Sequence, residues 1–242
     1  MKKRLPSLSS NFATIIEDGG YYVDKTHFIQ TLEDFNHKVL FFLRPRRFGK
    51  SLFLSMLEYY YGIEHKAKFD ALFGSYYIGQ SENVTPLRNS YHILNFNFSG
   101  ISTRDGEELR ASFNNAIFSG ISDFITKYSL GNSIEVDSFK GEFGGADILR
   151  LFIEKLKSSG FKAQIYLMID EYDHFTNELL AFKTEDFKQL VAQNGWVRKF
   201  YETIKIYVGE GIVDRFIATG VTPVTLDSLT SGFNIARNIT LE

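Results

Sequence analysis

The sequence has no cysteine, only four prolines among its 242 residues, and no apolar run longer than five residues. Without cysteine, disulfide scaffolds, thiolate zinc sites and thiol nucleophiles are all excluded. A bilayer span needs about 20 apolar residues, so no membrane segment is expected. The 27 basic and 29 acidic residues give a formal charge of −2, which argues against a protein that coats polyanions. We therefore expect a soluble, cytoplasmic protein with at most local contacts to nucleic acid.

The chain does contain short apolar runs that alternate with longer amphipathic segments. The runs predict buried parallel strands at Val39–Leu43, His92–Phe98, Gln164–Ile169 and Arg215–Thr219. The intervening segments predict helices at Thr26–Phe35 (with Thr26 as N-cap), Lys50–Tyr61, Asp147–Ser158, Asp186–Ala192 and Trp196–Val208. Residues 83–88 and 130–145 are rich in Gly, Asn, Ser and Pro and predict loops. The alternation predicts an α/β fold, a mainly parallel sheet flanked by helices on both faces.

The first predicted strand runs into the turn RPRRFGKS, residues 44–51, and then into a predicted helix. The end of this turn matches the end of the phosphate-binding motif G-x-x-x-x-G-K-[ST], in the strand–loop–helix context that the motif requires. Gly49 lets the backbone approach phosphate oxygens, Lys50 reaches the β- and γ-phosphates, and the Ser51 hydroxyl suits Mg²⁺. Arg44 stands where the motif has its first glycine. A basic turn that precedes a chance Gly-Lys-Ser helix start remains the alternative.

A second signal is the strand at Ile165–Ile169, which ends in Asp170 and Glu171. Open α/β folds bind ligands at the carboxyl ends of their strands. If this strand lies beside the first, Asp170 holds Mg²⁺ near Ser51, and Glu171 orients or deprotonates the water that attacks the γ-phosphate. Solvated loop charge, a helix cap, or a transition-metal site that includes His174 are the alternatives.

A third strand, Arg215–Thr219, ends in a polar residue at the same predicted sheet edge. The Thr219 hydroxyl would bond the attacking water or the γ-phosphate. A threonine that merely caps a strand before the turn at Gly220 explains the pattern equally well. The five histidines show no paired spacing, so zinc catalysis is not expected.

Four sequence boxes, taken together and in this order, resemble the AAA-ATPase-like family of bacterial proteins. They are Tyr21–Thr26, Arg44–Leu52, Met168–Asp173, and Thr219–Pro223 with Gly232–Ile235. The resemblance implies an ASCE-type P-loop NTPase fold, and the family shares the departure at Arg44. It also implies one domain over residues 1–242, with an N-terminal box and helix at 1–37 and a nucleotide-binding core at 38–242.

The same resemblance implies ATP and Mg²⁺ as cofactors and assigns roles to the matching residues. Glu171, Lys50 and Thr219 would be catalytic, with Thr219 as a sensor-1-like residue, and Ser51 and Asp170 would hold the metal. The nucleotide would contact Arg46, Arg47, Phe48, Gly49, Lys50, Ser51 and Leu52. For Arg46 and Arg47, the residue types alone leave solvation of the turn as an alternative to phosphate contact. The box from Tyr22 to Thr26 would lie near the adenine or brace the first helix.

Members of this family continue into a helical lid and a PD-(D/E)XK nuclease-like domain. The chain stops at residues 239–242, so we expect both parts to be missing from it, and we interpret the E-x-K at Glu64–Lys66 as chance. Two hypotheses follow. The domain hydrolyses ATP with Mg²⁺ to drive an effector domain or partner, or it is a nucleotide-binding regulatory module with little hydrolysis. An oligomer is compatible with either. Direct nucleic-acid binding through residues 44–47 would compete for the same arginines.

Overall fold

The computed structural model describes residues 9–35, 37–139, 144–182, 195–223 and 237–239. These residues form a five-stranded sheet in the order β2-β3-β4-β1-β5, and every neighbouring pair is parallel. The strands are β1 (Val39–Leu43), β2 (His92–Asn97), β3 (Ile165–Asp170), β4 (Val213–Gly220) and β5 (Arg237–Asn238). The four predicted strands are confirmed to within two residues at each end, and the short β5 was not predicted.

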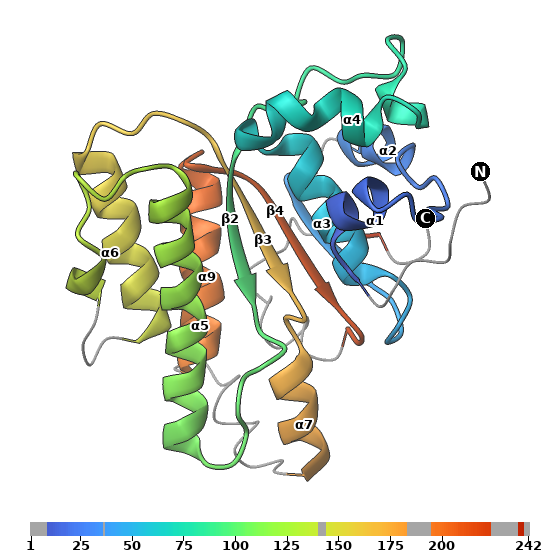
Figure 1. The fold of residues 1–242 in the computed structure, drawn as a ribbon. Helices are drawn as coiled ribbons and strands as arrows, with labels where there is room; N and C mark the ends of the chain where they lie inside the picture. The colour runs from blue at the N-terminus through green and yellow to red at the C-terminus, as the bar shows by residue number, and fades with distance from the viewer. Residues whose placement is uncertain (1–8, 36, 140–143, 183–194, 224–236, 240–242) are drawn as a thin grey trace.

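Helices cover both faces of the sheet (Figure 1). One face carries α1 (Phe12–Glu17), α2 (Phe28–Asp34), α3 (Lys50–Tyr61) and α4 (Phe69–Phe73). The other carries α5 (Gly106–Lys127), α6 (Gly145–Ser158) and α9 (Trp196–Gly209). The helix α7 (His174–Phe182) follows β3 and extends beyond the carboxyl ends of the strands. Short 3-10 segments lie at Ile63–Lys68, Tyr77–Gly79 and Val136–Phe139.

The apolar core is divided by the sheet into two clusters, because successive strand side chains point to opposite faces. Phe41 and Leu167 pack with α5, α6 and α9. Leu40, Met168 and Ile217 pack with the helices that precede β2. Burial on both faces explains why the strands read as continuous apolar runs rather than as alternating patterns.

The prediction that Thr26 caps the second helix is wrong. The helix α2 begins at Phe28, and its N-cap residue makes no side-chain hydrogen bond to the helix. Instead, the Thr26 hydroxyl donates to Asp24 at 2.7 Å and accepts the N–H of Ile78 at 3.1 Å. Asp24 also accepts the N–H of Tyr77 at 2.8 Å. The polar residues of the N-terminal box therefore hold residues 77 and 78 against the chain before α2.

The helix α5 was not predicted. Asp105 caps it by accepting the N–H of Glu108 at 2.8 Å, and Leu109, Phe113 and Ile117 follow at spacings of four on its buried side. The sequence D-x-x-E before an apolar repeat was the signal available. The predicted helix Asp186–Ala192 lies outside the described residues. Of the helices in the described ranges, none has the length and apolar character to cross a membrane.

Candidate functional site

The turn between β1 and α3 has the backbone expected of an anion-binding loop. Gly49 and Arg47 both adopt left-handed conformations, with φ of 79° and 67°. Glycine accepts this region readily, whereas a side-chain-bearing residue such as Arg47 does so at a cost in strain. The helix α3 begins directly at Lys50, so its positive end faces the turn. The predicted start of this helix is confirmed to the residue.

Arg44 occupies the motif's first glycine position without strain, because its φ is not among the positive ones. Its N–H donates to the Gly220 carbonyl at 3.0 Å and extends the pairing of β1 with β4. The guanidinium turns back, donates to the Leu43 carbonyl at 3.3 Å, and lies 5.1 Å from the centre of the Phe42 ring. A Cβ is therefore accommodated at this position.

Residues of this turn and of the helix α3 that follows it line two cavities. A cavity of about 460 Å³ is lined mainly by aromatic and aliphatic side chains and includes Phe48, Gly49 and Leu52. A cavity of about 430 Å³ is lined mainly by hydroxyl, amide and carboxylate side chains and includes Ser51 and Asp170. Of the predicted nucleotide-contacting residues, Phe48, Gly49 and Leu52 thus line the apolar space and Ser51 the polar one, whereas Lys50 lines neither.

The first cavity draws on residues far apart in the sequence. The N-terminal box contributes Tyr21, Tyr22, Val23 and Lys25, and the end of the described chain contributes Ile239. The Tyr22 ring stands edge-on to Phe12 and Tyr76, with centroid distances of 5.1 and 5.4 Å. The box therefore both lines the cavity and packs against the first helix.

The remaining predicted residues of the turn are placed as follows. Arg46 and Arg47 are exposed and line neither cavity. Phe48 is 68 % exposed at the rim of the apolar cavity. Lys50 is only 5 % exposed, and its Nζ donates to the Pro45 carbonyl at 3.4 Å, across the turn. The ammonium therefore lies within the loop that the motif assigns to phosphate.

The strand that carries Asp170 does not lie beside β1, so the condition attached to the predicted placement of Asp170 near Ser51 is not met. The strand β4 is inserted between β1 and β3. A pairing order of strands is set by contacts far apart in the sequence, so the local pattern could not supply it. The insertion brings Thr219, in register with Phe42 of β1, to the position between the turn and Asp170.

The side chains of Asp170 and Thr219 are hydrogen-bonded to each other. Thr219 is fully buried, and its hydroxyl donates to Oδ1 of Asp170. The N–H of Glu171 donates to the same oxygen at 3.0 Å and approaches the Thr219 hydroxyl at 3.4 Å. Among the described residues, all the hydrogen bonds of this carboxylate thus fall on Oδ1, which leaves Oδ2 for another ligand.

A polar residue of β2 that was not predicted as a site residue lies beside Asp170. Asn97 is in register with Asp170 and lines the same cavity as Ser51. Its position at the end of a predicted strand was the available signal. Hydroxyl, amide and carboxylate oxygens are the donors that Mg²⁺ prefers, so the residues present fit this metal.

Glu171 follows the strand in a left-handed conformation, with φ of 53°. Its carboxylate does not line the polar cavity; its Oε2 lies 3.5 Å from Nδ1 of His174. The structure therefore brings Ser51, Asp170 and Thr219 to one place, and holds Glu171 at its edge.

Asp173 joins the turn after β3 to the chain that leaves β4. Its side chain is 1 % exposed, and its Oδ2 accepts the N–H groups of Val221 and Thr222 at 2.9 and 2.7 Å. The same oxygen accepts the Asn177 side-chain amide at 2.8 Å. Tyr172 adds a hydrogen bond from its hydroxyl to the Thr222 carbonyl at 2.7 Å. These bonds fix the relative position of the two strand ends.

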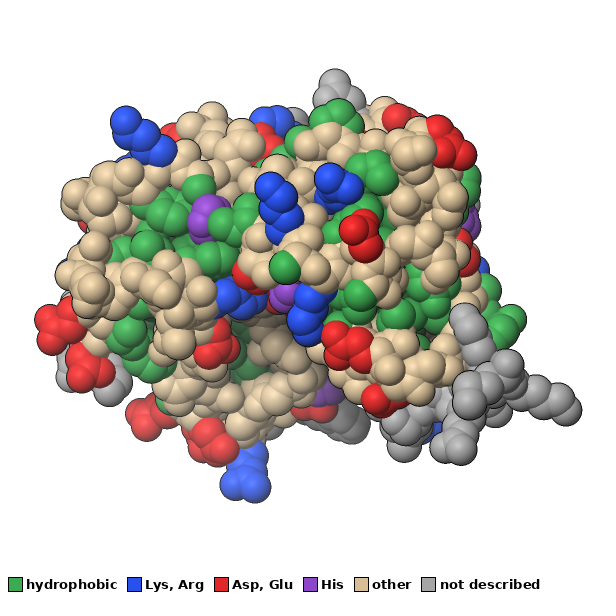
Figure 2. All heavy atoms as spheres, turned by 45° about the horizontal axis from the view of Figure 1, so that its top comes forward, with side chains coloured by type: hydrophobic (Ala, Val, Ile, Leu, Met, Phe, Trp, Pro, Cys, Tyr) green, Lys and Arg blue, Asp and Glu red, His purple; other side chains and the backbone are tan. Residues whose placement is uncertain are grey.

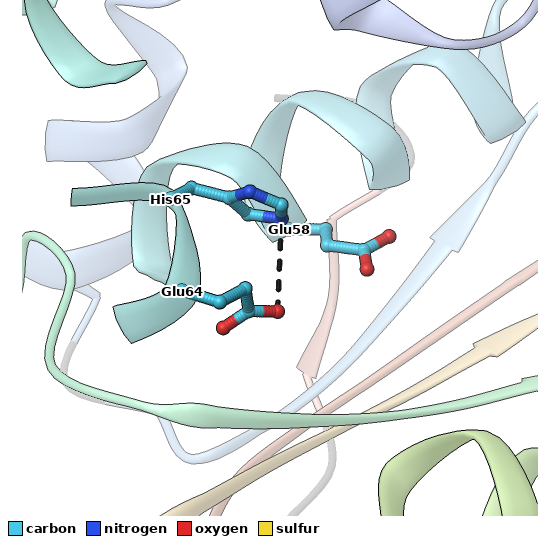
Figure 3. A group of neighbouring side chains, drawn as sticks. All are labelled: Glu58, Glu64 and His65. Atoms are coloured by element: carbon cyan, nitrogen blue, oxygen red, sulfur yellow. Dashed lines mark ion pairs between the residues drawn. The ribbon is translucent and has the colours of Figure 1, made fainter. Parts of the chain in front are cut away.

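A second group with metal-ligand character lies at the far end of α3 (Figure 3), and its Glu58 also lines the polar cavity. Glu58, Glu64 and His65 place one ligand atom each within 4.8 Å of one another. However, Nζ of Lys127 on α5 lies 2.8 Å from Glu58 and 3.4 Å from Glu64. Burial is the main influence on the His65 imidazole and lowers its pKa. We interpret the group as an ion-pair cluster that joins α3 to α5, because the Lys127 ammonium pairs with both carboxylates.

The order of the strands, the turn between β1 and α3, and the carboxylate at the end of β3 define the α/β fold of a P-loop NTPase-like protein. The chain belongs to the AAA-ATPase-like family, described as Predicted AAA-ATPase, whose model matches residues 8–230. This membership indicates that the chain binds ATP or a related nucleotide.

A protein of Azotobacter chroococcum mcd 1, described as an uncharacterized protein in vnfD 5'region, is 28% identical over 248 residues. The match covers 100% of this chain and 42% of that relative. The chain therefore spans less than half the length of this relative.

Proposed function

We propose that the chain is a Mg²⁺-dependent ATPase domain that binds the base in the apolar cavity and the phosphates on residues 44–51. The observation that carries the proposal is the position of this turn. Its residues Arg44, Phe48 and Gly49 line an apolar space. Ser51, at its end, lines a polar space together with Asp170, so both candidate metal ligands belong to the polar space. A nucleoside triphosphate has the same division between an apolar base and a charged, metal-binding end.

The composition of the apolar cavity supports adenine as the base. Phe28, Phe48 and Phe53 offer rings for stacking, and the charged lining residues, Lys25 and Arg44, are both basic. Guanine presents a paired N–H edge that a carboxylate recognises well, and no aspartate or glutamate is found among the described residues that line this cavity.

The phosphate end is supported by the donors of the turn. The Lys50 ammonium bonds only weakly to the Pro45 carbonyl, at 3.4 Å, so a phosphate oxygen would be a stronger partner. Ser51 and Asp170 would hold Mg²⁺, which supplies charge neutralisation at the β- and γ-phosphates when bound.

Hydrolysis requires a base for the attacking water, and Glu171 is the candidate. It follows Asp170 directly, and the N–H group of Glu171 is fixed on the Asp170–Thr219 pair. The buried Thr219 hydroxyl holds Asp170 in place beside the proposed metal. Glu171 would accept the proton from water as the water oxygen bonds to the γ-phosphorus and the bond from that phosphorus to the β–γ bridging oxygen breaks, with ADP as the leaving group.

Thermal denaturation with ATP and Mg²⁺ tests nucleotide binding. Ligand at about 100 times its Kd stabilises by about 2.7 kcal/mol. For a chain of this size, that corresponds to a rise in Tm of roughly 5–10 °C. We expect Lys50→Ala to lose this rise and Lys68→Ala, at an exposed ion pair with Glu17, to keep it. An equal rise in Lys50→Ala would refute the site.

Phosphate release tests hydrolysis. We expect Glu171→Gln to abolish release and to retain the ATP-dependent rise in Tm. GTP in place of ATP tests the base, and a larger rise with GTP would contradict the adenine assignment.

A regulatory module with little hydrolysis is the second candidate function. It is favoured by the contact of the Glu171 carboxylate with His174 instead of with the polar cavity. ATP binding without phosphate release, measured in a family member as long as the Azotobacter relative, would support it. The resemblance implies a nuclease-like effector, and the greater length of the relative is compatible with one.

Direct nucleic-acid binding has less support. On the face shown in Figure 2, the blue basic side chains are interspersed with red acidic ones and form no continuous patch among the residues drawn in colour. Salt-dependent DNA or RNA binding that survives saturating ATP would overturn this conclusion.

A further inference from the structure

We propose that His174 is a positioning residue that holds the Glu171 carboxylate for water activation, through a chain that runs on to Glu178 and Thr103. The inference rests on the proposed function and deepens it, because the phosphate-binding motif and the family resemblance assign no task to this histidine.

The two ring nitrogens of His174 each face a carboxylate. Nδ1 lies 3.5 Å from Oε2 of Glu171, and Nε2 lies 3.6 Å from Oε1 of Glu178. The His174 side chain is 22 % exposed, so the contacts are partly shielded from solvent. The ring therefore bridges the candidate base and the next turn of α7.

The far end of this bridge is anchored outside α7. Glu178 uses its other oxygen, Oε2, to accept the Thr103 hydroxyl at 2.9 Å. Thr103 lies in the loop that follows β2, so the chain of contacts joins two strand ends. Glu178 is thereby held, and with it the imidazole that it faces.

Glu171 has a backbone that is fixed and a side chain that needs a partner. Its N–H group bonds to Asp170, the next N–H group, of Tyr172, bonds to the Thr219 carbonyl at 2.9 Å, and its own φ is 53°. These interactions fix the Cα but not the carboxylate three bonds away. Within the described ranges, His174 supplies the ion-pair contact of that carboxylate.

The consequence is specific to the chemical step. A general base must lie within hydrogen-bond reach of the water that it activates, and a misplacement of about 1 Å costs roughly 100-fold in rate. Removal of the ring would free the Glu171 carboxylate to rotate, while the phosphate turn and both cavities remain intact. We expect kcat to fall roughly 10- to 100-fold, with the KM for ATP unchanged.

Three substitutions separate the two contacts of the ring. The side-chain amide nitrogen of His174→Asn occupies the place of Nδ1, whereas that of His174→Gln occupies the place of Nε2. We expect His174→Asn, which keeps the donor beside Glu171 but loses the anchor on Glu178, to keep part of the kcat. His174→Gln and His174→Ala should lose most of it. The exposed His37→Ala is the matched control. Equal rates in His174→Ala and the unaltered protein, or a faster rate in His174→Ala, would overturn the inference.

A second measurement does not depend on turnover. The imidazole resonances of His174, assigned by their loss in His174→Asn, should move in nucleotide-free Glu171→Gln. Those of His92, which packs between Tyr128 and Phe161, should not. Unmoved His174 resonances would refute the contact whether or not ATP binds. Conversely, a Lys50-independent response to ATP would refute the proposed function even if the His174 resonances move.

Discussion

Replacement of Asp173 by alanine offers a direct test of how the two strand ends are joined. The carboxylate is 1 % exposed, and its Oδ2 accepts two main-chain N–H groups, of Val221 and Thr222. Truncation would leave both donors without this acceptor. An unsatisfied buried donor costs about 1–3 kcal/mol, and water that enters the vacated space offsets part of it. We expect a net loss of about 3 kcal/mol in the free energy of unfolding.

Thermal denaturation followed by circular dichroism measures this loss. For a chain of this size, roughly 2–4 °C of Tm corresponds to 1 kcal/mol, so the expected decrease is roughly 6–12 °C. Asp173→Asn keeps an acceptor for the two N–H groups but loses the charge and places an NH₂ group where the other oxygen was, so its loss should be about 1–2 kcal/mol. The control is Asp147→Ala, at a half-exposed ion pair with Arg150, with an expected loss of about 0.5 kcal/mol.

The order of the three variants decides the result. A loss of stability in Asp173→Ala no greater than that in Asp147→Ala would show that the hydrogen bonds of Asp173 to Val221 and Thr222 contribute nothing. A loss in Asp173→Asn as large as in Asp173→Ala would show that the charge, and not the acceptor geometry, carries the effect. Either result would refute the account of this turn.

Three further predictions concern other parts of the chain. In Gly120→Ala, the new Cβ would lie 2.3 Å from the Asn95 carbonyl oxygen. We therefore expect urea unfolding to show a net loss of at least about 1 kcal/mol in the free energy of unfolding, despite the higher helix propensity of alanine. Gly131→Ala, in open space, is the control and should change this free energy by less than about 0.5 kcal/mol. Burial opposes ionisation of Asp24, but the hydrogen bonds that it accepts prevail and lower its pKa. The stabilisation from these bonds is therefore complete above the unfolded-state pKa of about 3.9 and is lost as the pH falls through the lower folded value. The difference in Tm between the unaltered protein and Asp24→Asn should shrink below about pH 4. Arg44→Gly restores the motif's glycine but should lower the free energy of unfolding by about 1 kcal/mol, seen as a lower Tm. Position 44 does not need a positive φ, and the contact of the guanidinium with the Phe42 ring is lost.

The parts of the fold that depend on local sequence could be predicted. The helix α3 was placed correctly at both ends, because Gly49 and the apolar face that follows it are local features. The strands were recognised as continuous apolar runs, since both faces of the sheet are covered. The helix α5 was missed because asparagine, serine and a central glycine weaken its pattern. Gly120 is required there by the close approach of β2, which the sequence does not display.

The candidate site divides in the same way. The residues of the turn and the carboxylates after β3 were recognised from residue type and spacing, and their functional roles stay predictions. The apolar cavity could not be derived from spacing, because it joins Tyr22, Phe48 and Ile239 from three distant segments. Asn97 was overlooked because one polar residue at a strand end is a weak signal until its neighbour, Asp170, is known.

The inserted strand explains why the site has room for its proposed ligands. Neighbouring strands are about 4.8 Å apart, so β1 and β3 are separated by roughly 10 Å with β4 between them. A carboxylate on a strand next to β1 would lie within direct ion-pair reach of Lys50 and would compete with phosphate for it. With β4 inserted, Asp170 instead bonds to Thr219, and Lys50 remains on its own turn. In the proposed function, a terminal phosphate and a hydrated Mg²⁺ would lie between them. Any movement of β4 would act on both Asp170 and, through the hydrogen bonds that Asp173 accepts from Val221 and Thr222, the turn that carries Glu171.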